Sequence, residues 1–362
     1  MVKIVNIKTR KENLHYPIYI GQGIIDILLN YVRKIQKNRK VVLVTDVAVG
    51  NLYPALVKKI PCDLVIILPS GEKIKSREIK AQIEDTLLER KYGRDTLLIV
   101  LGGGVVGDLT GFVAATYHRG IPFVQVPTTL LSMVDASIGG KTAVNTDYGK
   151  NLIGCFHQPE MVVADVDFME TLTEEEFLNG LAEIVKTACI LDKKFFERLE
   201  KEHKTILKRE NMLPIIKKTI ELKKNIVNAD SLEKRSRQIL NFGHTLGHGI
   251  ETASGNLIKH GFAVSMGIAA ENYISSKLGI LSEEDSKRTR ILLENLHLPV
   301  KIPEELETEK ILKAMMNDKK NFHHEIRTVL LSRIGKAYKE NNIYSFPVKE
   351  GLIREIIDRC KK

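Results

Sequence analysis

The first half of the chain alternates short apolar runs with segments of helical periodicity, and this alternation constrains the fold more than any other feature. The apolar runs are β-rich and mostly bounded by Gly, Pro or Asp: Val41–Val44, Leu64–Ile67, Leu97–Leu101, Phe123–Val126 and Val162–Ala164. Helix-period segments, such as Ser76–Arg90 and Gly107–Tyr117, lie between several of them. An earlier pair, Val2–Ile7 and Ile18–Ile20, has a hairpin pattern. This order predicts a parallel, doubly wound α/β sheet.

The second half of the chain is helical in pattern from about Thr173 onward. The predicted helices are Glu174–Ile190, Met212–Asn228, Gln238–Ala253, Gly261–Leu278, Glu283–Leu296 and Thr308–Met316, with a short strand at Arg327–Leu331. We therefore expect an α/β domain over 1–171 and a mostly α-helical domain over 172–362. Two domains also fit a chain of 362 residues, at roughly 100–200 residues per domain.

The chain carries a formal net charge of +10, which is compatible with nucleic-acid binding or with an anionic small substrate. The basic residues are spread out and no nucleic-acid module is recognisable, so the second interpretation is favoured. The four cysteines form no C-x-x-C pair, which is typical of free thiols in a reducing compartment. Apolar stretches fall short of the ~20 residues of a membrane span, and we expect a cytoplasmic protein.

A glycine-rich turn follows the predicted strand Leu97–Leu101. Gly102, Gly104 and Gly107 fit the pattern G-x-G-x-x-G, in which backbone N–H groups at a helix start meet a pyrophosphate. A tight turn without a ligand is the alternative, but the strand–glycine–helix context favours a cofactor. The acid usually found ~20 residues further on is missing, and the carboxylate nearest a strand end is Asp46, upstream. The pattern indicates a dinucleotide site arranged differently from the common one.

A second group of residues has the chemistry of a metal site. His244 and His248 are four residues apart and would share one helix face, and His260 directly precedes a predicted helix. Glu183 and Lys186 share a face of an otherwise apolar helix, where they must be paired, metal-bound or exposed. Two imidazoles and a carboxylate form a catalytic zinc set with an open position. Histidines satisfied within a protein core are the alternative.

Taken together, these motifs resemble the dehydroquinate synthase family over nearly the whole chain. The resemblance rests on blocks that stand in the family's order: 70–75 (SGEKIK), 102–108, 127–135 (PTTLLSMVD), 139–142 (GGKT), 149–151, 182–186 (AEIVK), 240–248 and 318–320. It implies a phosphorus–oxygen lyase that closes 3-deoxy-D-arabino-heptulosonate 7-phosphate into 3-dehydroquinate, the second step of the shikimate pathway, and releases phosphate. The implied route is transient oxidation by NAD+, phosphate elimination, reduction, ring opening and aldol closure, with Zn2+ or Co2+ as the metal.

The resemblance also implies roles for individual residues. Metal ligands would be Glu183, His244 and His260. Catalytic residues would be Asp135, Lys141, Lys186, Arg237, Asn241 and His248, the last assisting proton transfer. Substrate would also contact Lys150, Asn151, Lys223, Lys319, Lys320 and Arg119, which reaches the phosphate across a homodimer interface. NAD would be lined by Asp46, Ser70, Gly71, Glu72, Lys75, Gly103, Gly104, Val105, Val106, Gly107, Asp108, Thr128, Thr129, Lys141, Lys150, Phe168, Met169, Glu170 and Thr171.

The chain departs from the family pattern in three places. Arg235 stands where a glycine is usual, Ser231 where a glutamate is common, and 322–324 (Phe-His-His) where a glycine-bearing turn is expected. Three other functions stay open: a sugar phosphate cyclase of the 2-deoxy-scyllo-inosose or valiolone type, a metal-dependent polyol dehydrogenase with net NADH release, and a basic nucleic-acid-binding protein.

Overall fold

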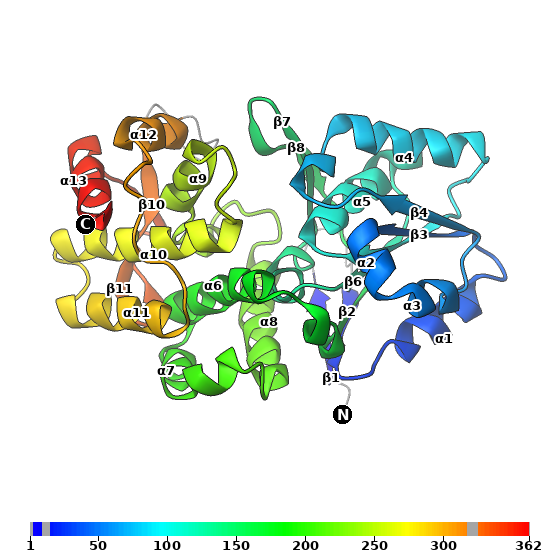
Figure 1. The fold of residues 1–362 in the computed structure, drawn as a ribbon, viewed down its shortest axis with the longest axis horizontal. Coiled ribbons are helices and arrows are strands. Elements are labelled where there is room, and N and C mark those ends of the chain that lie inside the picture. The colour runs from blue at the N-terminus through cyan, green and yellow to red at the C-terminus, as the bar shows by residue number, and fades with distance from the viewer. Residues whose placement is uncertain (1–2, 9–14, 317–324, 362) are drawn as a thin grey trace. The chain divides into compact units, whose positions relative to one another are not determined.

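The computed structural model describes residues 3–8, 15–316 and 325–361. Its contacts divide the chain into two compact units, Met1–Thr173 (unit 1) and Glu174–Lys362 (unit 2). Figure 1 shows unit 1, in blue to green, as a sheet with helices against it, and unit 2, in green to red, as a mostly helical body. The predicted combination of an α/β fold with a helical one is confirmed.

Unit 1 is built on a sheet of seven strands, counted over the described residues. From one edge to the other they are β1 (Lys3–Lys8), β2 (His15–Gly21), β9 (Met161–Asp165), β6 (Phe123–Pro127), β5 (Leu97–Gly102), β3 (Val41–Asp46) and β4 (Leu64–Leu68). β1 and β2 pair antiparallel, as the hairpin pattern predicted, and the other neighbouring pairs are parallel. The five internal apolar runs all became strands within two residues of the predicted bounds.

The continuous apolar runs form strands because the central strands are buried on both faces, as in parallel sheets generally. All six residues of β5 and the first five of β3 are buried. On one face, side chains of these strands pack with α4 (Arg77–Glu89) and α5 (Gly104–Thr116). Three more helices were not predicted: α1 (Asp26–Ile35), α2 (Val47–Leu52) and α3 (Pro54–Lys59). The first of them buries an apolar stripe of Leu28, Leu29 and Val32.

The chain order of the strands creates a switch point at the carboxyl ends of β3 and β5. Within the sheet, β3 is followed in the chain by β4 on one side of it and then by β5 on its other side. Thr45 pairs with Leu101, so Asp46 and Gly102 end neighbouring strands at the same level. Open α/β sheets bind ligands at such a point. This register explains how an acid upstream of the glycines reaches the same edge of the sheet.

A hairpin of β7 (Lys141–Thr146) and β8 (Gly149–Phe156) corrects the sequence analysis, which had no strands in this stretch. Its polar and glycine-rich residues lack the apolar alternation that marks a strand. A Cβ atom on Gly154 would lie 2.1 Å from the carbonyl oxygen of Thr142, so the two strands approach as closely as they do only because residue 154 has no side chain.

Unit 2 is mostly helical. Its helices are α6 (Glu174–Leu191), α7 (Lys193–Leu207), α8 (Met212–Ala229), α9 (His244–Ala253), α10 (His260–Lys277), α11 (Glu283–Asn295), α12 (Thr308–Met316) and α13 (Glu350–Lys361). Of these, α7 and α13 are not among the helices predicted above. The prediction of one helix over Gln238–Ala253 was wrong. A 3-10 helix (Ser236–Asn241) ends before α9, and Gly243 between them adopts a left-handed φ of 75°. The predicted strand Arg327–Leu331 divides into β10 (Arg327–Val329) and β11 (Leu331–Arg333), which pair with β13 (Ser345–Pro347) and β12 (Lys336–Ala337).

Two helices lie at the centre of unit 2. α6 is buried from Phe177 to Ile190, and α10 is buried along most of its length, as expected for helices that are apolar on nearly every side. α10 shares an apolar core with α9, α12 and α13. The four cysteines are free thiols, and Cys189 and Cys360 are buried. No helix in the described part of the chain is long and apolar enough to cross a membrane.

Glycines let three helices of unit 2 approach at backbone distance. A Cβ on Gly267 of α10 would lie 2.0 Å from the carbonyl oxygen of Gly243, at the start of α9. A Cβ on Gly261, in the first turn of α10, would lie 1.9 Å from the carbonyl oxygen of Asn179 in α6. These contacts fix the spacing of α6, α9 and α10.

Replacing Gly267 by Ala should therefore destabilise the protein by about 3 kcal/mol or more, the upper end of ordinary overpacking costs, because a backbone carbonyl cannot move aside as a side chain can. The matched control is Gly351→Ala in α13, where an added Cβ meets nothing within 4 Å. The control should be neutral or stabilising by less than ~1 kcal/mol. Urea unfolding measures both free energies, and equal losses in the two variants would contradict the packing argument.

Candidate active site

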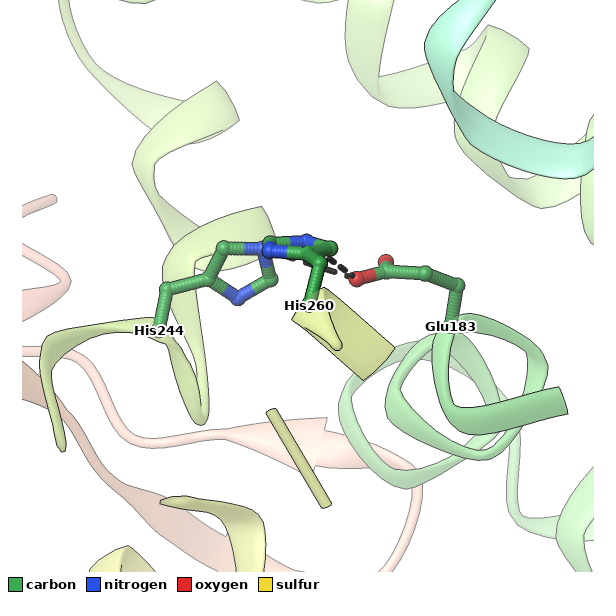
Figure 2. Close-up of side chains that lie close together, drawn as sticks. All are labelled: Glu183, His244 and His260. Carbon is green, nitrogen blue, oxygen red and sulfur yellow. Dashed lines mark ion pairs between the residues drawn. The ribbon is translucent and has the colours of Figure 1, made fainter. Parts of the chain in front are cut away.

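Three helices each contribute one side chain to a compact group in unit 2. Glu183 comes from α6, His244 from the start of α9 and His260 from the start of α10, and Figure 2 shows both imidazoles beside the carboxylate. The Nε2 atom of His244 and the Nε2 atom of His260 each lie 3.5 Å from Oε1 of Glu183. Glu183 is only 1% exposed. The residues named from the sequence as metal ligands therefore lie together.

The other nitrogen of each ring faces a hydrogen-bond acceptor, which orients the ring. Nδ1 of His244 lies 3.0 Å from the carbonyl oxygen of Phe242. Nδ1 of His260 lies 3.4 Å from Oε2 of Glu251, which the sequence analysis did not single out. If each Nδ1 carries the proton, each Nε2 offers its lone pair toward Glu183. This is the arrangement that metal-binding histidines have in proteins.

The spacing of these atoms fits a divalent cation. Zinc binds carboxylate oxygen and imidazole nitrogen at ~2.0–2.2 Å, so two ligand atoms on a tetrahedral ion lie roughly 3.3–3.6 Å apart. Both nitrogen–oxygen separations here are 3.5 Å. Three protein ligands leave a fourth position open, as in catalytic rather than structural zinc sites.

The group carries strong electrostatic interactions. Lys186, which is 1% exposed, pairs with Glu183 one helical turn away on α6. Burial lowers the pKa of His260, but hydrogen bonds and charge from Glu183 and Glu251 outweigh burial and raise that pKa to about 10. The surroundings of the ring thus stabilise a positive charge at this point. His248 lies beside the group, with its ring centroid 5.4 Å from that of His244 and 5.9 Å from that of His260.

Two buried side chains that the sequence analysis missed hold the helix starts in place. Glu271 of α10 is fully buried and accepts hydrogen bonds from the backbone N–H groups of Gly243 (2.7 Å) and Leu246 (3.3 Å) at the start of α9. Asn179 of α6 accepts the N–H of Gly261 at 2.6 Å, at the start of α10. An acid within the apolar stretch of α10 was the signal for Glu271, since a buried carboxylate needs partners.

A loop before α9 carries further residues named from the sequence. The carboxylate of Asp230 accepts the backbone N–H groups of Lys234 (3.0 Å), Arg235 (2.6 Å) and Arg237 (3.0 Å). The guanidinium of Arg237 is 2% exposed and donates to the carbonyl oxygen of Ser231 at 2.9 Å. Asn241 donates to Glu233 at 3.0 Å. The loop is therefore built around one carboxylate.

The remaining substrate residues named from the sequence fall in several environments. Lys223, on α8, is 4% exposed. Lys141 begins β7 and Lys150 lies on β8, so both are residues of the hairpin. Asp135 lies in a helical turn at Ser132–Ala136, and exposed Arg119 has a left-handed φ of 68°. Lys319 and Lys320, with the departure at 322–324, lie outside the described residues.

In unit 1 the glycine turn stands at the sheet's switch point. Gly103 precedes α5, which begins at Gly104, so the helix starts three residues before the predicted Gly107. The N–H of Thr128, just past β6, donates to the carbonyl oxygen of Gly102 at 3.0 Å. A Cβ on Gly103 would lie 3.1 Å from the Thr129 side chain. The glycines, the two threonines and the N-terminus of α5 thus lie together at the carboxyl edge of the sheet.

Asp46 and Ser70 lie at the carboxyl ends of the adjacent strands β3 and β4. Asp46 accepts the N–H of Val49 at 2.9 Å and the hydroxyl of Ser70 at 3.2 Å. The 3-10 helix Val166–Thr171, which holds the other residues named for NAD, packs through Phe168 on the ring of Tyr53 in an edge-on contact at 4.9 Å. These segments border the same carboxyl edge of the sheet.

A buried ammonium group ties the glycine helix to the hairpin. Nζ of Lys75 lies 2.5 Å from the carboxylate of Asp108 on α5 and 2.5 Å from Oδ1 of Asn151 on β8. Burial raises the pKa of Asp108 above its ordinary value, although Lys75 opposes the shift. Glu72, one residue past Gly71, accepts from Asn145 at 2.7 Å.

Asp230 provides a test of the loop in unit 2. Burial would raise its pKa, but the three backbone N–H groups and the charge of Arg237 hold that pKa below its ordinary value. A lowered pKa stabilises the fold above the unfolded-state value of about 3.9, and the gain is lost as pH falls through the folded-state pKa. Asp230→Asn should therefore cost about 1–2 kcal/mol at pH 7, and the difference from the parent should shrink below pH ~4. Urea unfolding across pH checks this, and a pH-independent difference would count against it.

Comparisons with known proteins agree with this geometry. The profile of the 3-dehydroquinate synthase N-terminal region matches residues 65–179, and that of the C-terminal region matches residues 180–321. A 3-dehydroquinate synthase of Thermodesulfovibrio yellowstonii is 43% identical over 89% of this chain and 92% of its own length. One of Coxiella burnetii is 41% identical over 94% of this chain and 97% of its own length.

Solved structures show the same fold. A 2-deoxy-scyllo-inosose synthase complexed with carbaglucose-6-phosphate, NAD+ and Co2+ has a TM-score of 0.85 at 23% identity, over 99% of this chain and 100% of its own. A 2-epi-5-epi-valiolone synthase of Streptomyces hygroscopicus with NAD+ and Zn2+ bound has a TM-score of 0.83 at 25% identity, over 97% of this chain and 98% of its own. On the two matched profiles and the identity to its curated relatives, this chain belongs to the 3-dehydroquinate synthase family.

Proposed function

We propose that the chain converts 3-deoxy-D-arabino-heptulosonate 7-phosphate to 3-dehydroquinate with release of phosphate, using NAD+ and Zn2+ or Co2+. Relatives 41–43% identical over about nine-tenths of the chain carry this activity in their names. The observation that carries the proposal is the convergence of two imidazole nitrogens on one carboxylate oxygen at the spacing of a zinc coordination shell.

Glu183, His244 and His260 would hold the divalent ion in unit 2. When bound, the ion supplies a Lewis acid that lowers the pKa of a substrate hydroxyl. The buried ammonium of Lys186 and the nearby ring of His248 would donate hydrogen bonds or move protons beside that hydroxyl. Arg237, Lys223 and Asn241 would bind the substrate's anionic groups, because charge-assisted hydrogen bonds are roughly twice as strong as neutral ones.

The carboxyl edge of the sheet in unit 1 would hold NAD+, which supplies the hydride acceptor and donor of the reaction. The turn at Gly102–Gly104 and the start of α5 suit a pyrophosphate, and Asp46 suits a ribose hydroxyl. Thr128, Thr129 and the 3-10 helix Val166–Thr171 border the same edge. In this proposal, unit 1 would be the nucleotide-binding domain and unit 2 the metal- and substrate-binding domain.

Three finer assignments belong to the same proposal. The partner is a small anionic substrate rather than nucleic acid or membrane. The protein acts as a homodimer in the cytoplasm, and the exposed guanidinium of Arg119 serves the neighbouring subunit. Asp135, Lys141, Lys150 and Asn151 are further substrate-binding residues in this proposal. Size-exclusion chromatography with light scattering tests the dimer.

A single assay distinguishes this function from its rivals. With the heptulosonate phosphate, NAD+ and Zn2+, the purified protein should release phosphate and form dehydroquinate in equal amounts with no net NADH. Glucose 6-phosphate and sedoheptulose 7-phosphate, two other sugar phosphates, should give less than about a hundredth of that rate. Net NADH formation from a simple polyol would instead indicate a dehydrogenase, and turnover of glucose 6-phosphate alone would contradict the substrate assignment.

Glu183→Gln should remove the metal site. Losing one charged ligand of three should reduce metal content at micromolar Zn2+ to near zero and turnover by at least about a thousandfold. NAD+ affinity should be retained, since its proposed residues lie in unit 1. The matched control is Glu175→Gln on the same helix, an exposed carboxylate that pairs with Lys259. Full activity of metal-free Glu183→Gln would refute the proposed role of the metal.

A further inference from the structure

We propose that Glu251 is a positioning residue that fixes the ring of His260 and, through it, the affinity and geometry of the metal centre. The inference rests on the proposed metal site and adds to it a carboxylate that touches neither substrate nor metal. Its Oε2 atom lies 3.4 Å from Nδ1 of His260, on the opposite side of the ring from Glu183.

Glu251 is buried, which makes its hydrogen bond to His260 important for the carboxylate as well as for the ring. Glu251 is 4% exposed, and burying a carboxylate is costly unless it is paired or hydrogen-bonded. It lies in the last turn of α9, where its backbone carbonyl accepts the hydroxyl of Ser254 at 2.8 Å and the N–H of Asn256 at 2.9 Å. These hydrogen bonds hold the backbone at Glu251 in place and so fix the position from which its carboxylate reaches the ring of His260.

His260 needs such a partner more than His244 does. The side chain of His260 is 29% exposed, whereas that of His244 is 11% exposed, so packing restrains the ring of His260 less. His244 is oriented by the neutral carbonyl of Phe242, two residues earlier in the chain. His260 relies on a charged acceptor from another helix. A carboxylate acceptor fixes the tautomer and also makes Nε2 a stronger donor to the metal.

A competing role for Glu251 is to bind a cation itself, because ligand atoms of His248, Glu251 and His260 lie within 4.8 Å of one another. That second ion and the proposed one would both use His260. An imidazole can ligate through both nitrogens only if it loses both protons, which is unfavourable near neutral pH for a ring already beside two carboxylates. The positioning role needs no such deprotonation.

The test is metal binding rather than turnover. Dissociation constants for Zn2+ and Co2+ are measured by chelator competition on the purified full chain of the parent, Glu251→Ala and Glu251→Gln. Glu251→Ala should bind both ions about 10–100-fold more weakly. Glu251→Gln keeps the shape and a carbonyl acceptor, so it should lose less affinity than Glu251→Ala. The matched control is Glu294→Gln on α11, a carboxylate paired with Arg290, and it should bind like the parent.

The visible spectrum of bound Co2+ supplies a readout that a loss of stability would not move. With Co2+ saturating, Glu251→Ala should shift or weaken the ligand-field bands because the ring of His260 is no longer fixed, while Glu294→Gln should match the parent. Parent-like affinity and spectrum in both Glu251 variants would overturn the inference and leave the metal site intact. Two equivalents of Zn2+ in the parent, falling to one in both variants, would overturn it in favour of direct ligation. A parent that binds neither ion would instead refute the proposed metal centre.

Discussion

The close approach of α6, α9 and α10 is the constraint on which unit 2 depends. Packed helices with ordinary side chains usually lie about 8–10 Å apart, measured from axis to axis. Here backbone carbonyls of Gly243 and Asn179 occupy the space that side chains at Gly267 and Gly261 would fill. Glu271 and Asn179 then fix the helix starts by hydrogen bonds. The group of Glu183, His244 and His260 follows from this packing.

In unit 1, the order and register of the strands bring the proposed NAD residues to one edge of the sheet. Parallel pairing of β3 with β5 puts Asp46 level with Gly102, and the next strand, β6, brings Thr128 and Thr129 to the same edge. No side chain has to reach far, because the register sets these positions. A chain that combines such an edge with a group of metal-type donors has the parts that a redox-assisted lyase requires.

Much of the fold could be predicted from the sequence, for identifiable reasons. The buried strands were visible because both faces are apolar, and α6 because its long apolar stretch needs a core around it. The hairpin β7–β8 was invisible, since glycine and polar residues hide its alternation, and the break at Gly243 depends on a carboxylate 28 residues away, Glu271. The three ligand types were evident in the sequence, but the partner of His260 was not. Glu251 looks like an ordinary helix-end acid until α9 and α10 are packed together.

The glycine contact between α9 and α10 also limits how such an enzyme can diverge. Because the helices meet at backbone distance, no substitution at Gly267 can widen their spacing without breaking the contact. A relative that binds another metal, or binds its metal more weakly, cannot have reached that state by a gradual change in the spacing of α9 and α10. Such a relative has to keep the helix spacing and change the residues that surround the metal ligands. Variation among relatives should therefore concentrate in those surrounding residues.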